Sequence, residues 1–326
     1  MSLLSLESIP QLQAEVRALA EQRGAVILAH NYQLPEVQDV ADYVGDSLGL
    51  SRQGAATDKE IIAFCGVHFM AETASILSPD KRVLIPDLDA GCSLADSISS
   101  DQLRAWQAKH PDAVTVMYVN TTAEVKALTD YCVTSSNAAA VVEHICAEHG
   151  PNVEILFGPD MFLGAYVEKV TGRKMRVWDG ECHVHAGIRP SDIERVRGEH
   201  PGADFLIHPE CGCSTSVMEY VAAGDVDATG VHMLSTGGML DYAVENKGTG
   251  ATAIMATETG MLHPLRMAAP DVEFIAANEA ASCRYMKMIT LPKLRDCLRH
   301  LTGEVRVPAE IAERARVPIE RMVAIG

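Results

Sequence analysis

Short runs of apolar, mostly β-branched residues alternate along the chain with segments of helical periodicity. Apolar runs of this length, bounded by turn residues, are typical of strands that are covered on both faces. The runs predict strands at 25–30, 61–64, 82–86, 113–119, 153–157, 175–178, 204–208, 251–255 and 272–276. Helical patterns lie between them at 35–44, 136–149 and 212–223, and one or two more helices are expected after Pro308. Strands that alternate with helices predict parallel sheets with crossover helices.

The ends of three predicted strands indicate an internal repeat. Each ends in a polar ring side chain, and a Ser or Thr that could cap a helix follows it: His30 with Ser47, Tyr118 with Ser135, and His208 with Thr236. The first two separations are both 17 residues, and the third is 28. The additional length lies in the segment 224–233, which resembles an insertion.

The second half of each repeat leads to one cysteine. A strand, a turn and a Met-bearing helix come first, and a further strand then runs to Cys92, Cys182 or Cys283. Gly66 precedes Cys92 by 26 residues, and the other two cysteines follow Gly158 and Thr259 by 24. The matching order and spacing predict three similar small parallel-sheet α/β domains with pseudo-threefold symmetry. The expected segments are 1–100 with an N-terminal helix, 101–190, and 191–326 with C-terminal helices; chance similarity among α/β segments is the alternative.

The repeat places polar residues where ligands usually bind. In open parallel sheets, ligands bind at the carboxyl ends of the strands. Three copies around one axis would direct Cys92, Cys182 and Cys283 into a central cavity. Three thiolates suit zinc or an iron–sulfur cluster, and the absence of a fourth symmetric ligand leaves one position open, as in catalytic metal sites. The alternative for each cysteine is a buried core thiol.

Other cysteines and histidines compete for a functional role. Cys211 and Cys213 form a CGC segment that could be a ligand pair, while Cys65, Cys132, Cys146 and Cys297 lie in strand or helix patterns and are expected in the core. His208 and Glu210, in a loop before a predicted helix, are acid–base candidates, and a helix-capping role is the alternative. His68, His183, His185, His232 and His263 also lie near strand ends, and the sequence does not rank them.

Charge and composition narrow the classes of protein. The formal net charge of −17 disfavours binding to nucleic acid, because phosphate backbones would be repelled. No run of about 18 apolar residues predicts a membrane span, and the first residues show no secretory signal pattern. Nine cysteines without an export signal favour reduced thiols over disulfides, and hence a cytoplasmic protein.

Many short motifs resemble the quinolinate synthase (NadA) family. They occur in order from about residue 26 to residue 298: AHNYQ, GDSLGLSR, DLDAGCSLADS, YVNTTAEVKALTDYCVTSSNA, FGPDMFLG, WDGECHVH, HPECGC, LSTGGM, TETGM and CRYMKMITL. The resemblance implies an enzyme of NAD biosynthesis, a transferase that makes quinolinate from iminoaspartate (iminosuccinate) and dihydroxyacetone phosphate, releasing phosphate and water. It also implies three α/β domains around a central [4Fe–4S] cluster with one open iron.

The resemblance also assigns residues. The cluster ligands would be Cys92, Cys182 and Cys283, and the proton-transfer candidates are Tyr32, His208 and Glu210. The substrate site would comprise His30, Tyr32, Ser47, Tyr118, Asn120, Ser135, His208, Glu210 and Thr236. An aspartate oxidase or dehydrogenase would supply iminoaspartate. Two other functions stay open: a different cluster-bearing hydro-lyase, and a non-catalytic redox sensor with a labile cluster.

Overall fold

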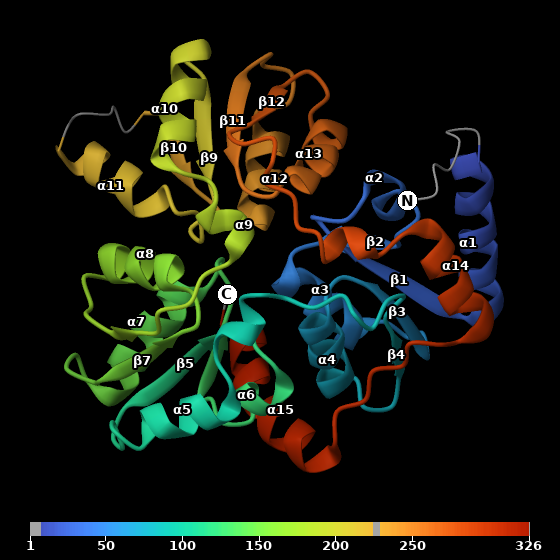
Figure 1. Ribbon diagram of the computed structural model, residues 1–326, viewed down its shortest axis with the longest axis horizontal. Coiled ribbons are helices and arrows are strands. Elements are labelled where there is room, and N and C mark those ends of the chain that lie inside the picture. Colours follow the sequence, from blue (N-terminus) through green and yellow to red (C-terminus); the bar gives the residue numbers. More distant parts are fainter. Residues whose placement is uncertain (1–7, 224–228, 326) are drawn as a thin grey trace.

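The computed structural model describes residues 8–223 and 229–325, so part of the segment expected to be an insertion, 224–228, lies outside the described residues. Three separate four-stranded sheets, each entirely parallel, form three lobes of the molecule (Figure 1). Their strand orders are β2-β1-β3-β4, β6-β5-β7-β8 and β10-β9-β11-β12, which is one topology used three times. The expected fold class of three similar α/β domains is therefore confirmed. In the part of the chain that is described, no helix is long and apolar enough to cross a bilayer.

The first domain contains the first sheet and the helices around it. Its central strand β1 has all six residues buried, and β3 beside it is also completely buried, as expected for strands covered on both faces. Its elements are α1 (Ile9–Arg23), β1 (Ala25–His30), α2 (Pro35–Gln38), β2 (Tyr43–Gly45), α3 (Ser47–Ala56), β3 (Ile61–Cys65), α4 (His68–Leu77), β4 (Arg82–Leu84) and the 3-10 helix η2 (Ala95–Ser97).

The second and third domains follow the same order. The second contains α5 (Ser100–Gln107), β5 (Val114–Tyr118), α6 (Ala123–Lys126), β6 (Tyr131–Val133), α7 (Ala138–His149), β7 (Ile155–Gly158), α8 (Met161–Thr171), β8 (Arg176–Val177) and α9 (His183–Ala186). The third contains α10 (Pro190–Glu199), β9 (Asp204–Ile207), α11 (Ser214–Ala223), β10 (Val231–Met233), α12 (Thr236–Glu245), β11 (Thr252–Ala256), η3 (Thr259–Met261), α13 (Leu262–Ala268), β12 (Glu273–Ala276) and η4 (Met286–Met288).

Two C-terminal helices join the domains. They are α14 (Leu291–His300) and α15 (Ala309–Ala324). Although both follow the third sheet in sequence, α14 packs against α1 of the first domain, and α15 packs against β6, α6 and α4 (Figure 1). The domain boundaries at 100 and 190 stay predictions.

The nine expected strands are all present, but the pattern missed one strand in each domain. The missed strands are β2, β6 and β10, which have three residues each and occupy the same edge of every sheet. The helix expected at 35–44 is wrong in its second half, because α2 ends at Gln38 and β2 begins at Tyr43. A strand of three residues is too short for the alternation of apolar and polar side chains to be recognised in the sequence.

Candidate active site between the three domains

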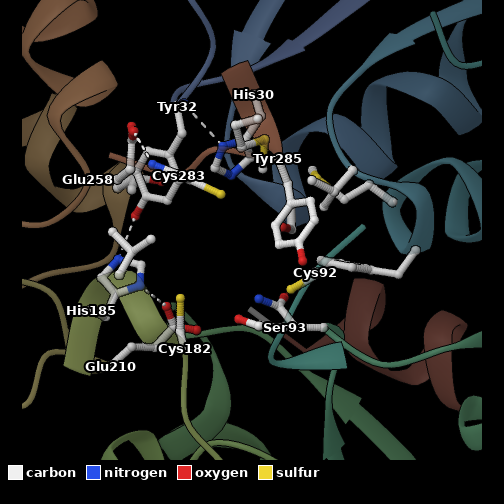
Figure 2. Close-up of a pocket in the computed structure, with 18 of the residues that line it drawn as sticks. His30, Tyr32, Cys92, Ser93, Cys182, His185, Glu210, Glu258, Cys283 and Tyr285 are labelled. Carbon is white, nitrogen blue, oxygen red and sulfur yellow. Dashed lines mark hydrogen bonds and ion pairs between the residues drawn. The ribbon is translucent and has the colours of Figure 1, made fainter. Parts of the chain in front are cut away.

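One cavity lies where the carboxyl ends of the three sheets face each other. It is lined by Cys92, Cys182 and Cys283 and by every residue that the sequence proposed for the substrate site: His30, Tyr32, Ser47, Tyr118, Asn120, Ser135, His208, Glu210 and Thr236. Figure 2 shows the three cysteines around a common central space, with Tyr32, His185 and Glu210 together on one side. The location expected for these residues is therefore found, while their individual roles stay predictions.

The three cysteines lie in equivalent turns. We call residues 92–96, 182–186 and 283–287 the cysteine turns. In each turn the cysteine carbonyl accepts a hydrogen bond from the N–H four residues later, that of Asp96, Ala186 or Lys287. A second backbone hydrogen bond also recurs. The carbonyl of the residue two positions before each cysteine accepts from the N–H of the residue that begins α4, α8 or η3. The pairs are Ala90 with His68, Gly180 with Met161, and Ala281 with Thr259. The predicted repeat is therefore also a repeat of backbone hydrogen bonds. The residues aligned from spacing were wrong in part, because His68, Met161 and Thr259 are equivalent, and Gly66 and Gly158 are not the counterparts of Thr259.

Each cysteine sulfur faces two backbone donors of its own turn. Burial raises the pKa of Cys92 to about 12, and hydrogen bonds from the N–H groups of Ala95 and Leu94 oppose that rise. The pKa values of Cys182 and Cys283 are also raised, mainly by burial, and N–H groups two and three residues later oppose the rise there too. Such donors stabilise a thiolate, but burial outweighs them, so a stable thiolate here needs a cation at the sulfur.

Polar side chains from all three domains lie in a row along the cavity wall, next to Cys283 at one end and Cys182 further along (Figure 2). The Tyr32 hydroxyl lies 2.6 Å from Thr257 Oγ1 and 3.2 Å from His185 Nε2. His185 Nδ1 lies 3.1 Å from Glu210 Oε2, and His208 Nδ1 lies 3.4 Å from the same oxygen. His208 Nε2 continues to Ser135 Oγ at 3.2 Å. Hydrogen bonds therefore link Tyr32, Thr257 and His185 at one end of this wall and His208 with Ser135 at the other. The Glu210 carboxylate lies close to both imidazoles between these two groups, although His185 Nδ1 has no hydrogen-bond partner among the described residues.

Burial changes the protonation of the carboxyl group and the two imidazoles in this part of the cavity wall. Burial first, and then the charge of Asp160, raise the pKa of Glu210 well above its usual range. Burial lowers the pKa of His185 to about 3 and that of His208 well below its usual range, so both imidazoles are neutral near pH 7. The two rings stack with centroids 4.9 Å apart, which suits neutral rings better than charged ones. A carboxyl group with a raised pKa is suited to exchange a proton at neutral pH.

The helix-capping role suggested for Ser47, Ser135 and Thr236 is wrong. Asn137, not Ser135, occupies the N-cap position of α7. The cap of α3 is Asp46, which accepts from the Gly49 N–H, and the cap of α12 is Ser235, which accepts from the Gly238 N–H. Ser47 and Thr236 are the first residues inside these helices, and Ser135 lies just before α7. Their hydroxyls face the cavity near positive helix ends, where an anion would be stabilised.

Several cavity residues were not singled out by sequence reasoning. His185 was named but not ranked, and Asp46, Glu258, Ser93 and Tyr285 were missed. For His185 a signal existed, since it lies three residues after Cys182 in CHVH. Glu258 occupies the same place after its central strand as Asp160, and comparing the repeats at that place would have found both.

Two donor sets could hold metal. His185, His208 and Glu210 offer ligand atoms within 4.8 Å of one another, close enough for one ion, whereas within the described residues the three cysteine sulfurs do not form so tight a group. Ligands of a polynuclear cluster attach to different irons and are necessarily further apart than ligands of one ion. The soft sulfur donors around an open space fit an iron–sulfur cluster. Cys211 and Cys213 are completely buried in the core of the third domain.

The fold and the cavity define a three-domain α/β protein with a cysteine-lined site that all three domains build. A sequence model described as "Quinolinate synthetase A protein", NadA, matches residues 14–324. A quinolinate synthase of Mycobacterium sp. (strain KMS) is 59% identical over 314 residues, which cover 96% of this chain and 91% of that protein. Proteins of the same name from Mycobacterium tuberculosis (strain ATCC 25177 / H37Ra) and Mycolicibacterium paratuberculosis (strain ATCC BAA-968 / K-10) are 57% and 58% identical, over 96% and 97% of this chain and 88% and 89% of theirs. The chain therefore belongs to the NadA family, as the motifs indicated.

Proposed function

We propose that this chain is a quinolinate synthase, which condenses iminoaspartate with dihydroxyacetone phosphate to quinolinate and releases phosphate and water, in de novo NAD biosynthesis. The observation that carries the proposal is that three equivalent cysteine turns and a buried group of Tyr32, His185, Glu210 and His208 line one cavity. Family membership over almost the whole chain supports it. The enzyme would work in the cytoplasm and receive iminoaspartate from an aspartate oxidase or dehydrogenase.

The cofactor of the proposal is a [4Fe–4S] cluster on Cys92, Cys182 and Cys283. When bound, a cluster with one open iron supplies a Lewis acid that assists the departure of hydroxide. The protein's contribution is the set of paired N–H groups at each sulfur, which fix the direction of the three thiolates. The His185–Glu210–His208 group would remain free for protons.

Glu210 is the proposed proton carrier. Its carboxyl lies between two neutral imidazoles, and its raised pKa lets it accept a proton from a carbon next to a carbonyl or return one to a leaving hydroxyl. His208 would relay protons toward Ser135. Burial also raises the pKa of Tyr32 well above its usual value, so its hydroxyl stays protonated and acts as a hydrogen-bond donor or an acid.

Local groups would hold the anionic substrates within an acidic protein. The hydroxyls of Ser47, Ser135 and Thr236 line the cavity at or near helix starts, where N–H groups attract carboxylate or phosphate. His30, Tyr118 and Asn120 at two other strand ends complete the proposed substrate contacts. These groups act at short range, so they can attract an anion despite the net charge of −17.

The deciding experiment is anaerobic purification with iron and sulfide analysis, followed by an assay with iminoaspartate and dihydroxyacetone phosphate. We expect quinolinate and phosphate to appear in equal amounts, and only in cluster-loaded protein. Dehydration of a hydroxy acid without consumption of dihydroxyacetone phosphate would instead indicate another hydro-lyase. A cluster-loaded protein without turnover would indicate a redox sensor, and either result would overturn the proposal.

A further inference from the structure

Two buried carboxylates occupy one repeat-equivalent position beside the cysteine turns. Asp160 and Glu258 each follow the central strand of their domain by two residues, and each caps the helix that comes next. Both residues are completely buried. The residue after each of them, Met161 or Thr259, donates its N–H to the carbonyl two residues before the domain's cysteine, which proves the equivalence by geometry. In the first domain this position is held by Val67, which is apolar.

Glu258 is bonded directly to the backbone of Cys283. Its Oε1 accepts the Cys283 N–H at 2.9 Å, and its Oε2 accepts the Gly260 N–H at 2.7 Å. Lys287 Nζ, at the end of the same cysteine turn, lies 3.0 Å from Glu258 Oε1. The ammonium also donates to the backbone carbonyl of Tyr32 in the first domain. One carboxylate thus connects the loop before a helix, the backbone of a cysteine, and the segment that carries Tyr32.

Asp160 is placed similarly but has fewer partners. Its Oδ1 accepts the Leu163 N–H at 2.7 Å, and its backbone forms a β-bridge with Gly180, two residues before Cys182. Its Oδ2 is buried and has no hydrogen-bond partner within residues 8–223 and 229–325. No lysine stands where Lys287 stands in the third domain, because the residue four after Cys182 is Ala186. The two carboxylates therefore share a position, while only Glu258 has a neighbouring ammonium group.

We propose that Glu258 is a positioning residue that holds the backbone of Cys283 for cluster binding and fixes the Tyr32 segment through Lys287. Asp160 has the equivalent position beside the Cys182 turn, to which it is joined by its bridge with Gly180. A buried carboxylate that accepts a backbone N–H fixes the direction of the peptide, and with it the direction of the cysteine side chain. Groups that orient metal ligands in this way commonly contribute about 10–100-fold to metal affinity. The inference rests on the proposed cluster.

The test compares Glu258→Gln with Asp130→Asn in cluster-loaded protein under anaerobic conditions. Gln keeps the size of Glu but offers one acceptor oxygen, so either the Cys283 or the Gly260 N–H faces an NH₂ group. Asp130→Asn is the matched control, since Asp130 Oδ2 accepts the Thr115 N–H at 2.8 Å and Asp130 precedes β6, away from the cysteine turns. The readouts are iron release to a chelator and the electron paramagnetic resonance spectrum of the reduced cluster.

We expect Glu258→Gln to release iron about 10–100-fold faster than the unaltered protein and to change the spectrum, while Asp130→Asn changes neither. Asp160→Asn should act in the same direction, and it carries the test alone if Glu258→Gln does not fold. Unchanged iron release and spectrum in both variants would overturn the inference, even if their melting temperatures fell. A protein that never acquires a cluster, with all its residues unaltered, would instead overturn the proposed function.

Discussion

The three cysteine turns and the three strand ends that face them are both repeated in position, but only the cysteine turns are repeated in residue type. The strand-end pairs are His30 with Tyr32, Tyr118 with Asn120, and His208 with Glu210, each two residues apart at the end of a central strand. Even their local geometry recurs, since the Tyr32 N–H and the Glu210 N–H both donate to Nδ1 of the histidine two residues earlier.

This difference matches two chemical requirements. The proposed cluster has three irons that bind to the protein and needs the same ligand at each of them. A backbone repeated three times supplies three such ligands in equivalent positions. An asymmetric condensation needs different groups on its different sides, and these arise when one repeated position is filled by different side chains. The repeat therefore fixes where the chemistry occurs, and the divergence of three positions determines which chemistry it is.

The largest effect is expected when one of the three cysteine turns loses its cysteine. Cys182→Ser should abolish the cluster and, with it, turnover, because an alcohol is a much poorer iron ligand than a thiolate. Iron and sulfide analysis with anaerobic kinetics measures both. Cys146→Ser is the control, since Cys146 lies on α7 within the core and should leave both properties largely intact. A full complement of iron in Cys182→Ser would contradict the ligand assignment.

A smaller effect is expected from Glu210, where the strand ends differ most. Glu210→Gln preserves size but removes the proton-carrying oxygen between His185 and His208. Turnover should fall by roughly 10²–10⁴-fold while the cluster is retained, which is the usual contribution of a general acid–base group. Anaerobic kinetics paired with thermal melting tests this. Near-normal turnover with a lowered melting temperature would favour a purely structural role for Glu210.

Tyr32→Phe tests the contribution of the strand end in the first domain. The substitution removes one hydroxyl that contacts Thr257 and His185 and leaves the ring in place. We expect turnover to fall by about 10²-fold, at the lower end of the range for proton-transfer groups, because His185 and Glu210 remain paired. The cluster spectrum should not change. A loss of iron in this variant would show that Tyr32 supports the cluster instead of the reaction.

The smallest expected effect is a pH dependence of stability from His30. Burial lowers the pKa of His30 to about 3, so the folded protein keeps this ring neutral while an unfolded chain protonates it near its usual pKa of about 6.5. Stability is therefore complete above about pH 6.5 and falls as pH decreases from there toward 3, by up to about 1.4 kcal/mol per pH unit for this group.

Urea unfolding of chelator-treated protein at about pH 7 and about pH 5 measures this dependence, and His30→Gln should reduce it. His144→Gln is the control, because its side chain is 44% exposed and forms an ion pair with Glu148 on the same helix. An equal pH dependence in the His30 variant and the unaltered protein would contradict the assignment.

Sequence reasoning found the cysteine turns, which are alike in the three domains, more fully than the strand ends, which differ. Cys92, Cys182 and Cys283 could be found because each follows the same order of strand, turn, helix and strand, although the spacing did not align equivalent residues. The pairing of His185 with Glu210 could not be found in this way, since the two residues come from different domains and meet only when the domains pack. Asp46 and Ser235 were overlooked as caps because a neighbouring Ser or Thr in each motif offered an equally good capping group.

The attachment of α15 has a consequence for the order in which this protein matures during synthesis. Asn137 Nδ2, in the loop that carries Ser135, donates to the carbonyls of Met322 at 2.9 Å and Ile325 at 2.7 Å. The second sheet can form as soon as its own strands have left the ribosome. Its cavity loop, however, acquires these two bonds only after all three sheets and α15 have been made. The site is therefore completed late, and we expect cluster delivery to follow the synthesis of α15.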